Sequence, residues 1–506
     1  MLDHPKDMAP IETFTGNCGL DQEEPLLFEI GRENMTGVDM EEPAPVAARL
    51  GALERKERIG LPGLSEPEAM RHYVRLSRKN YSIDAGLYPL GSCTMKHNPR
   101  LAEKMARLAG FADIHPLQPQ STAQGALLLM EELSHWLLEL THMSAVALSP
   151  KAGAHGELCG LMTIKTAIQM RGEAESRKVV LIPQSAHGTN PASAALLGFE
   201  VRAIPAGEDG VVHLDAVAAA VGPDVAAIML TNPNTCGLFE RDVVEIARLV
   251  HEAGGYFYCD GANFNAIAGV ARPGGMGVDA MHLNLHKTFS TPHGGGGPGA
   301  GPVVLSARLA PFAPLPFVIR DGERLRLVEH AEGTQSFGRM TAFHGQMGMF
   351  VRALAYILSH GSDGLAQASR DAVLSANYVR ASLRDVMTQP FGDRPCMHEV
   401  LFDDAWLKGT SVTTLDFAKA MIDEGYHPMT IYFPLVAHGA MLIEPTESES
   451  KQSLDQFIAT LRSLAESALQ GDSRRFASAP RYAPRRRLDE TAAARKPVLR
   501  WSGTKG

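Results

Sequence analysis

The sequence has few of the features that mark secreted or membrane proteins. Its six cysteines in 506 residues include no CxxC pair, which argues against a disulfide framework or a zinc site and favours reduced thiols. The longest apolar stretch, residues 212–230, is interrupted by two aspartates, a glycine and a proline, so it is not expected to cross a bilayer. Residues 1–7 resemble neither a secretory signal nor a transit peptide. We therefore expect a cytoplasmic protein.

Charge is ordinary in amount but uneven in distribution. The chain is 45% hydrophobic and 21% charged, as is usual for a globular protein of two or three structural units. Residues 471–506 carry a net charge of +7 and the remainder −16. An acidic body argues against general nucleic-acid binding. The basic tail, with Arg485-Arg486-Arg487, is interpreted as a solvated arm lying on the acidic surface; binding to nucleic acid or an acidic protein is the alternative.

Four regions are expected along the chain. Residues 1–115 are rich in proline, glycine and charge and indicate an irregular N-terminal arm with some helices. Residues 116–337 form a large domain and residues 338–470 a smaller C-terminal α/β domain with helices near 348–358 and 371–386. Residues 471–506 are the basic tail.

The large domain alternates short β-rich runs with helical segments. Strands are expected over residues 179–182, 201–204, 226–230, 256–259, 281–285 and 302–305. Helices are expected over residues 121–140, 158–170, 191–197, 214–221 and 242–253. This alternation predicts an α/β fold with a mostly parallel sheet covered on both faces. Ligands bind such sheets beyond the carboxyl ends of the strands, so the loops there are the ones to inspect.

The most specific motif is NLHKTF, residues 284–289, which follows an expected strand and precedes the glycine-rich run 293–299. A lysine at this position, Lys287, is well placed to be buried beside a ligand. Burial lowers the pKa of an ammonium group and frees the amine to form an imine. The glycines let the backbone approach a ligand or bend sharply. An isolated lysine would more often lie at the surface, so its neighbours decide the interpretation.

An aspartate is expected at the same edge of the sheet. Asp260 ends the strand 256–259 and is followed by Gly261-Ala262-Asn263. Enzymes that use pyridoxal phosphate need a carboxylate beside the pyridine nitrogen, because a protonated ring is an electron sink. Asp-Gly pairs are also common turn formers. Together with Lys287, however, Asp260 favours a pyridoxal phosphate site in which the lysine holds the cofactor as a Schiff base.

A phosphate-binding segment is expected at Lys151-Ala152-Gly153-Ala154-His155-Gly156, just before a helix. Small residues at a helix N-terminus leave amide groups open to an anion. A plain glycine-rich connection is the alternative. Neither a Walker A pattern nor Rossmann spacing occurs, so a nucleotide is poorly supported.

Polar residues follow two further strands. His187 could stack on the pyridine ring, and Asn232 could offer a polar group to the cofactor's phenolic oxygen. His282 and His286 would share one face of a strand, but zinc takes three or four ligands, so no metal site is expected.

These segments together resemble the pyridoxal phosphate-bearing half of the glycine cleavage system P-protein family. The resemblance runs from about Pro89 to Glu447 and rests on GSCTMKHNP (91–99), HGTNPAS (187–193), DGAN (260–263), the run 284–298, YFP (432–434) and IEPTE (443–447). The length matches subunit 2 of the split form, which pairs with a homologous subunit 1 lacking the cofactor lysine. At residues 343–346, FHGQ, relatives often have a Tyr and an Asn around the glycine.

The resemblance implies the aspartate-aminotransferase fold (fold type I) and a set of site residues. Lys287 would carry pyridoxal 5'-phosphate, Asp260 would pair with the pyridinium, His187 would stack on the ring and the amides of Gly153 and Ala154 would hold the phosphate. The further contacts implied are Asn232, Asn263 and His286 to the cofactor, and Lys96, His97 and Cys93 near the substrate, on a loop that resembles an active-site lid.

The implied reaction is decarboxylation of glycine with transfer of the aminomethyl group to the lipoyl arm of H-protein. The implied partners are subunit 1, in an α2β2 heterotetramer, and lipoylated H-protein; neither a nucleic acid nor a membrane is expected. Two alternatives stay open. One is another fold type I enzyme, such as an amino-acid decarboxylase or a cysteine desulfurase that would use Cys93. The other is a non-catalytic partner subunit, against which Lys287 and Asp260 argue.

Overall fold

The computed structural model describes residues 24–38, 40–41, 44, 47, 49–57, 59–293, 299–330, 333–483 and 486–500. Residues 1–7, Cys18, the glycines at 294–297 and Arg485, all considered above, lie outside these ranges. The chain divides into two compact units, residues 1–82 and residues 83–506. Among the helices of the described ranges, none combines the length and apolar character that a membrane span requires.

The first unit contains helices α1 (Leu27–Ile30) and α2 (Glu66–Arg78). A capping box at Ser65 and Glu68 satisfies the free amides at the start of α2. Glu24 is fixed to the side of α2, because its carboxylate lies 2.6 Å from Nδ1 of His72 and also pairs with Arg75. Among the residues of this unit that the structure describes, the chain outside these helices and a 3₁₀ turn at Gly51–Leu53 is irregular.

A seven-stranded sheet, in the order β1-β7-β6-β5-β4-β2-β3, forms the centre of the second unit. The strands β3, β2, β4, β5 and β6 are parallel, whereas β7 is antiparallel to β6 and β1 to β7. The bounds are β1 (Ala145–Ala147), β2 (Val179–Pro183), β3 (Glu200–Ile204), β4 (Val225–Thr231), β5 (Tyr256–Asp260), β6 (Ala280–His282) and β7 (Val303–Leu305). The predicted α/β class and mostly parallel sheet are confirmed.

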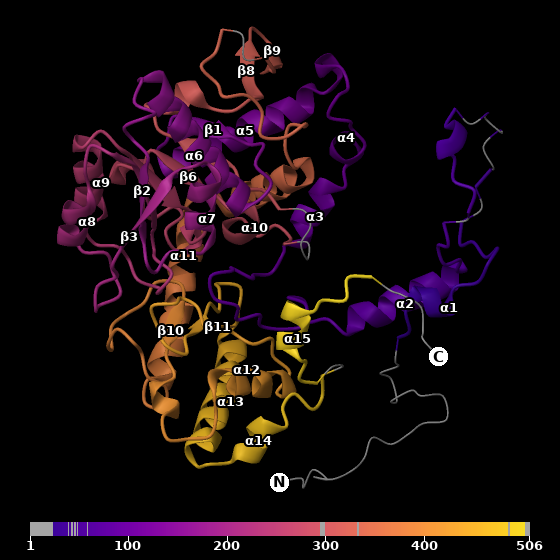
Figure 1. Ribbon diagram of the computed structural model, residues 1–506, viewed down its shortest axis with the longest axis vertical. Helices are drawn as coiled ribbons and strands as arrows, with labels where there is room; N and C mark the ends of the chain where they lie inside the picture. Colours follow the sequence, from indigo (N-terminus) through magenta and orange to yellow (C-terminus); the bar gives the residue numbers. More distant parts are fainter. Residues whose placement is uncertain are drawn as a thin grey trace. The chain divides into compact units, whose positions relative to one another are not determined.

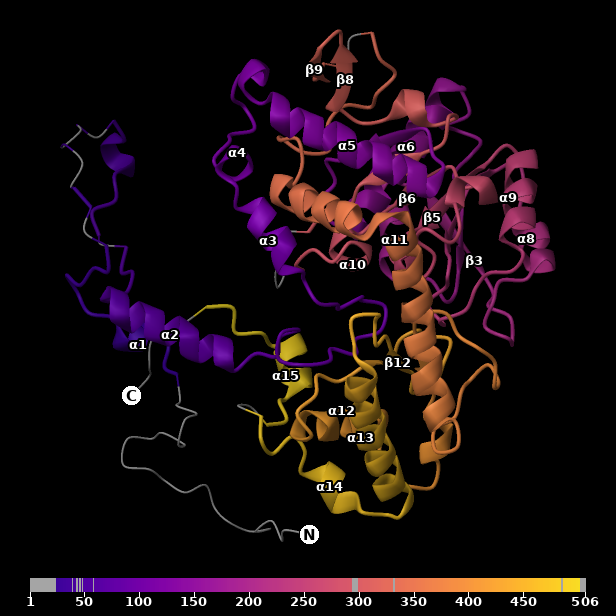
Figure 2. The same ribbon diagram turned by 180° about the vertical axis from the view of Figure 1, so that it is seen from behind.

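Both faces of the sheet are apolar. Alternate residues of a strand point to opposite faces, and here both sets of residues are hydrophobic. In β5, Phe257 and Cys259 join one core cluster, while Tyr256 and Tyr258 join another. The first face is covered by α5 (Gln124–Thr141), α9 (Val243–Glu252) and part of α11 (Met347–Leu383), and the second by α6 (Gly153–Met170) and α7 (Thr189–Leu196). Figure 2 shows α5 beside the first part of α11. The helix α8 (Leu214–Ala220) packs beside β3 and α9.

The strand expected over residues 281–285 is shorter than predicted. It ends at His282, and Lys287 lies in the short helix α10 (Leu285–Thr288). The turn is anchored by the amides of Leu283 and Leu285, which donate to the carbonyls of Pro302 and Ala300. Lys287 therefore lies at the carboxyl end of the strands on a helical turn and not on the strand itself.

A long helix, α11, connects the large sheet to a C-terminal α/β layer (Figure 1). The two helices expected there are two helical segments of α11 that meet at Gly361, whose φ of +66° and ψ of −177° are not helical. The layer contains the three-stranded antiparallel sheet β10-β12-β11, with β10 (Val400–Phe402), β11 (Thr430–Ile431) and β12 (Met441–Ile443). Its helices are α12 (Thr414–Asp423), α13 (Lys451–Leu469) and α14 (Ser473–Ala477).

The compact units divide at residue 82, whereas the sequence placed the end of the arm at residue 115. The reason is that Leu90 pairs with Ile443 of β12, and α3 (Arg100–Ala106) packs on α11. At the other end, Phe476 is buried in the C-terminal core, so the basic tail begins as part of that layer. The remaining elements are α4 (Ala109–Ala112), the hairpin β8 (Phe317–Asp321) and β9 (Arg324–Val328), and α15 (Glu490–Arg495).

Candidate active site

A cavity of about 230 Å³ lies at the carboxyl ends of three neighbouring parallel strands. The last residues of β4, β5 and β6, which are Thr231, Asp260 and His282, line it together with the start of α6. Seven of the eight residues predicted to bind the cofactor face this cavity: Lys287, Asp260, His187, Gly153, Ala154, Asn263 and His286. The remaining lining residues are Ser92, Glu157, Thr189, Thr231, Thr235, Ala262, His282 and Asn284.

Lys287 is half-buried and faces the cavity from α10. Its ammonium group donates a hydrogen bond of 2.9 Å to the backbone carbonyl of Ser92. That partner is a neutral carbonyl, so the amine is oriented without being tied to a carboxylate. A group held in this way can exchange its partner for a ligand more easily than a lysine in a buried ion pair.

Asp260 is buried at the end of β5. Its Oδ2 accepts a hydrogen bond from Nδ2 of Asn190 at 3.0 Å, and its Oδ1 accepts one from the amide of Ala262 at 2.9 Å. Nε2 of His282 lies 3.4 Å from Oδ1. Burial raises the pKa of Asp260, but His282, these hydrogen bonds and Lys287 outweigh it and lower the pKa overall. The carboxylate therefore stays ionised.

Glu157 is a second buried carboxyl group in the cavity wall, which the sequence analysis missed. It accepts hydrogen bonds from the hydroxyls of Thr189 at 2.7 Å and Ser193 at 3.2 Å. Burial and then the charge of Asp260 raise the pKa of Glu157 to about 7. Opposite shifts in neighbouring carboxyl groups are typical of acid–base sites. Its place in the first turns of α6, four residues after Gly153, was the available sequence signal.

His187 is joined to Glu157 through one side chain. Its Nδ1 lies 2.8 Å from the hydroxyl oxygen of Thr189 and accepts a 3.2 Å hydrogen bond from the amide of Thr189. The imidazole also meets Phe433 edge to face, with 5.6 Å between ring centres. Burial lowers the pKa of His187, so the ring is neutral at physiological pH.

The start of α6 is open towards the cavity. A β-carbon on Gly153 would lie only 2.8 Å from Nδ2 of Asn284, so a larger residue would crowd the cavity wall. Nearby, Oγ1 of Thr231, Oδ1 of Asn284 and Nδ1 of His286 are buried without a hydrogen-bond partner in the described structure. Burial lowers the pKa of His286 to about 3, which leaves that ring neutral. An anion-binding helix N-terminus, unpartnered polar atoms, a lysine and a carboxylate fit pyridoxal phosphate.

Asn232 lies beside the cavity without lining it. Its Oδ1 accepts a 3.0 Å hydrogen bond from the amide of Glu240, which turns the side chain into the loop that follows β4. Asn263, by contrast, lines the cavity and donates from Nδ2 to the carbonyl of Pro233 at 3.0 Å. A strand-end position was thus sufficient for Asn263 to reach the cavity but not for Asn232.

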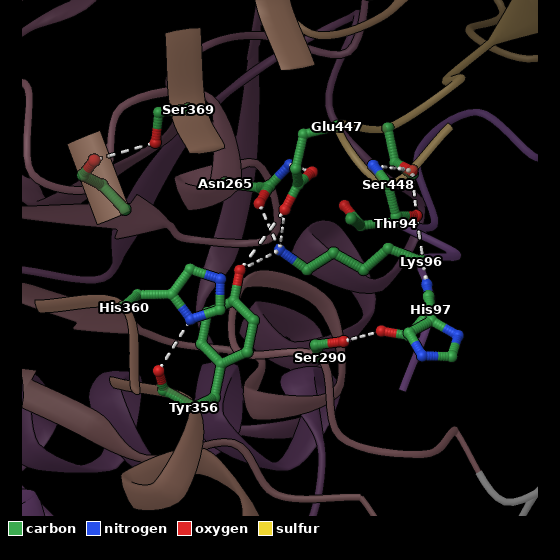
Figure 3. Close-up of polar contacts among 12 residues, drawn as sticks. Thr94, Lys96, His97, Asn265, Ser290, Tyr356, His360, Ser369, Glu447 and Ser448 are labelled. Atoms are coloured by element: carbon green, nitrogen blue, oxygen red, sulfur yellow. Dashed lines mark hydrogen bonds and ion pairs between the residues drawn. The ribbon is translucent and has the colours of Figure 1, made fainter. Parts of the chain in front are cut away.

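Lys96, predicted near the substrate, is instead held in a buried polar cluster outside the cavity wall (Figure 3). Its ammonium group donates to Oε1 of Glu447 at 2.6 Å, to Oδ1 of Asn265 at 2.8 Å and to the hydroxyl of Tyr356 at 3.3 Å. Burial lowers its pKa, but Glu447 and Tyr356 more than offset this and raise it. These three contacts fix the side chain in this cluster, and its approach to the substrate stays a prediction.

The other two residues of that loop also lie away from the cavity wall. His97 is exposed, and its amide donates to the hydroxyl of Ser448 at 3.1 Å (Figure 3). The sulfur of Cys93 lies 3.7 Å from Nδ1 of His293, and burial raises the pKa of the thiol. Neither residue is among those that line the cavity.

Comparison with solved structures defines the class to which this fold belongs. A crystal structure of glycine decarboxylase (P-protein) of the glycine cleavage system, in inhibitor-bound form, matches with a TM-score of 0.69 and 20% identity over 83% of this chain and 93% of that one. A cysteine desulfurase from Thermococcus onnurineus matches with a TM-score of 0.59 and 14% identity over 76% of this chain and 96% of that one. At residues 160–298 the sequence matches the aminotransferase class-V family. The predicted fold type I architecture is confirmed.

Sequence comparison then identifies the family. Residues 368–479 match the family described as glycine dehydrogenase, C-terminal domain. The probable glycine dehydrogenase (decarboxylating) subunit 2 of Caulobacter vibrioides is 67% identical over 97% of this chain and 94% of the relative. The corresponding protein of Caldanaerobacter subterraneus is 48% identical over 94% of this chain and 98% of the relative. The chain belongs to the glycine dehydrogenase (decarboxylating) subunit 2 family, which confirms the resemblance found in the sequence.

Proposed function

We propose that this chain binds pyridoxal phosphate through Lys287, decarboxylates glycine and passes the aminomethyl group to the lipoyl arm of H-protein. The observation that carries the proposal is that Lys287, Asp260 and the open start of α6 face one cavity. The 67% identity to a named glycine dehydrogenase subunit 2 supports glycine as the substrate.

Each lining residue has a separate task in this proposal. Pyridoxal phosphate, when bound, supplies a conjugated ring that accepts the electron pair left behind by departing CO2. The ionised Asp260 holds a proton at the pyridine nitrogen, because burial with fixed donors keeps its own charge in place. The amides of Gly153 and Ala154 bind the phosphate at the helix N-terminus. His187 would lie against one face of the ring, and Lys287 would hold the cofactor through its amine.

Glu157 and His187 provide a path for protons in and out of the cavity. With a pKa of about 7, Glu157 can both hold and release a proton near neutral pH. Oγ1 of Thr189 lies 2.7 Å from Oε1 of Glu157 and 2.8 Å from Nδ1 of His187, so a protonated Glu157 can donate to this hydroxyl while the hydroxyl donates to Nδ1. Protonation at Glu157 would also reduce repulsion between its carboxyl group and that of Asp260.

The partners follow from the family. The names of the relatives as subunit 2 support pairing with a subunit 1. We further propose an α2β2 heterotetramer and, from the resemblance to the glycine cleavage system P-protein, lipoylated H-protein as the acceptor. The described cysteines, Cys93, Cys159, Cys236, Cys259 and Cys396, are free thiols, which supports the cytoplasmic location proposed from the sequence.

The replacement Lys287→Ala tests catalysis. We expect it to remove the visible absorption band of the bound cofactor and to reduce glycine–bicarbonate exchange to background. Lys451→Ala is the matched control, because Lys451 is exposed on α13. A normal absorption band, or full exchange activity, in the Lys287 variant would contradict the proposal.

Two further measurements test the partners and the rival enzyme. We expect a homologous second chain to co-purify with this one, and a fully active lone homodimer would reject the heterotetramer. A cysteine desulfurase would form a persulfide on incubation with free cysteine. We expect none at Cys93, because its thiol has a raised pKa and is not among the groups lining the cavity.

A further inference from the structure

Ser92 is held between Lys287 and a carboxylate of the C-terminal layer. Its carbonyl accepts the 2.9 Å hydrogen bond from Lys287, and its amide donates a 2.7 Å hydrogen bond to Oε2 of Glu399. The residue has a φ of +64°, in the left-handed region that side chains other than glycine rarely adopt. A strained backbone of this kind persists only where its surroundings fix it, and it is often found at functional sites.

The segment that carries Ser92 is fixed to the small sheet, whereas Lys287 belongs to the large sheet. The amide of Gly91 donates to the carbonyl of Leu442 in β12 at 3.2 Å, and Thr430 donates from its hydroxyl to the carbonyl of Gly91 at 2.6 Å. A β-carbon at residue 91 would lie 2.4 Å from Cγ of Leu442, so only glycine allows this approach. Ser92 is therefore a link between the two layers.

Glu399 provides the charged end of this link. It directly precedes β10 and is fully buried. Nδ2 of Asn263, a residue of the cavity wall, lies 3.4 Å from its second oxygen. Burial raises the pKa of Glu399 to about 7, while the hydrogen bond from Ser92 and the charge of Lys287 oppose that rise. Above pH 7 the carboxylate therefore makes a charge-assisted bond to the Ser92 amide.

His398 and Glu444 lie beside Glu399, and the three form a buried cluster that could be mistaken for a metal site. The pairing of Val400 with Ile443 places Glu399 opposite Glu444 across the strands. Both oxygens of Glu399 already accept hydrogen bonds, and Oε1 of Glu444 accepts one from Thr94 at 2.6 Å. Among the side-chain atoms of these three residues, only the two nitrogens of His398 and Oε2 of Glu444 lack a hydrogen-bond partner in the described structure, so Glu399 is the member of the cluster that is fully engaged, by Ser92 and Asn263.

We propose that Glu399 is a positioning residue for Lys287, acting through the backbone of Ser92, whose left-handed φ sets the angle between the peptide unit that carries its amide and the one that carries its carbonyl. The carboxylate fixes the Ser92 amide, and this orients the carbonyl of the same residue towards Nζ of Lys287. The amine is thereby pointed into the cavity before a ligand binds. The inference rests on the proposed function, because it assigns to Lys287 the covalent reaction with pyridoxal phosphate.

The test measures the reactivity of one amine in the full-length protein. The cofactor-depleted chain is mixed with pyridoxal phosphate at pH 8 and reduced with borohydride at intervals, and peptide mass spectrometry gives the labelling rates of Lys287 and of the exposed Lys451. We expect Glu399→Ala to lower the ratio of the two rates by about tenfold, since a hydrogen bond to a charged group is lost. Glu399→Gln keeps the size and an acceptor oxygen, so we expect about a threefold reduction.

Glu240→Gln is the matched control. Glu240 is also buried and accepts a backbone hydrogen bond, from the amide of Val212 at 2.8 Å, but it has no contact with Ser92 or Lys287 in the described structure. We expect it to lower the melting temperature and leave the rate ratio unchanged. A purely structural role of Glu399 would likewise move only the melting temperature.

The outcomes separate the two proposals. A folded Glu399→Ala protein whose rate ratio lies within twofold of the wild type overturns the positioning role. If that variant does not fold, a wild-type ratio in Glu399→Gln overturns it. Absence of labelling at Lys287 in the wild-type protein instead overturns the proposed function.

Discussion

Two lysines that the sequence placed near the same site have opposite environments. Lys96 is buried and bound to a carboxylate, an amide oxygen and a phenol, with its closest contact of 2.6 Å to Glu447 (Figure 3). Lys287 is half-buried, faces a cavity and donates to a backbone carbonyl. Lys96 is paired with a carboxylate and has no cavity beside its ammonium group in the described structure. Lys287 lies beside a cavity and has a neutral hydrogen-bond partner.

This difference separates a structural lysine from one that can react. A buried ammonium paired with a carboxylate is costly to disrupt, since removing either group leaves an unpaired charge. An amine beside a cavity can leave a carbonyl acceptor without leaving a charge unpaired. Position in a family-like motif therefore does not by itself distinguish a reactive lysine from a structural one; the hydrogen-bond partners do.

The largest expected effect is a contrast between alanine variants of the two lysines, one of which should lose stability and the other cofactor binding. Lys96→Ala should destabilise the fold by about 3–5 kcal/mol, because the carboxylate of Glu447, only 11% exposed, loses its charged partner. Lys287→Ala should change the melting temperature little while removing cofactor binding. Thermal unfolding of both variants measures the contrast. The double variant Lys96→Met/Glu447→Leu should recover stability, and a double variant as unstable as Lys96→Ala would contradict this explanation.

Asp260→Asn should reduce the rate of glycine–bicarbonate exchange by about 100-fold, since the amide cannot hold a proton at the pyridine nitrogen. Asp279 is the control, because it is buried at the start of β6, away from the carboxyl end, and bonds His251 at 2.7 Å. Asp279→Asn should cost stability and not exchange activity per folded molecule. An equal loss of exchange activity in both variants would show that Asp260 has only a structural role.

Gly153→Ala should weaken the binding of pyridoxal phosphate by about tenfold, because the new methyl group would crowd Asn284 at the phosphate end of the cavity. Gly125→Ala is the matched control, because a β-carbon at this position near the start of α5 would meet no atom within 4 Å. Fluorescence titration of the depleted protein gives both affinities. Unchanged binding in the Gly153 variant would place the phosphate elsewhere.

The smallest effect concerns Glu157. Its folded-state pKa of about 7 lies above the ordinary value of 4.5, so the folded protein holds a proton that the unfolded chain releases. The stability due to this group is present below pH 4.5 and is lost as the pH rises to about 7. Glu157→Gln does not ionise and so avoids this loss of stability. The melting temperature of the variant minus that of the wild type should therefore increase by a few degrees from pH 5 to pH 8. A difference that does not depend on pH would contradict the assigned pKa.

Much of the fold could be predicted because its signals are local. The strands β2 to β5 and the helices between them follow from apolar periodicity over a few residues. Lys287 and Asp260 could be found for the same reason, since carboxyl ends of parallel strands meet at one edge of a sheet. The last residue of β4 pairs with the last residue of β5, and this brings the two loops together.

The misses involve contacts between distant positions. Asn232 has the sequence context of a cavity residue, but a bond with the amide of Glu240 turns it away. Glu399 and Ser92 are 307 residues apart, and Lys96 and Glu447 are 351 residues apart. Neither pairing leaves a periodic or spacing signal, so the sequence could name Lys96 but not its hydrogen-bond partners.

The sequence by itself determined the α/β class, the succession of β2 to β5 along the chain, and the lysine and aspartate that we propose for the site, because each depends on a pattern a few residues long. The tertiary structure alone decided which polar groups share the cavity, that Glu157 has a pKa near neutrality and that Ser92 connects Lys287 to the small sheet. Burial and charge act through space, and only the folded chain sets those distances.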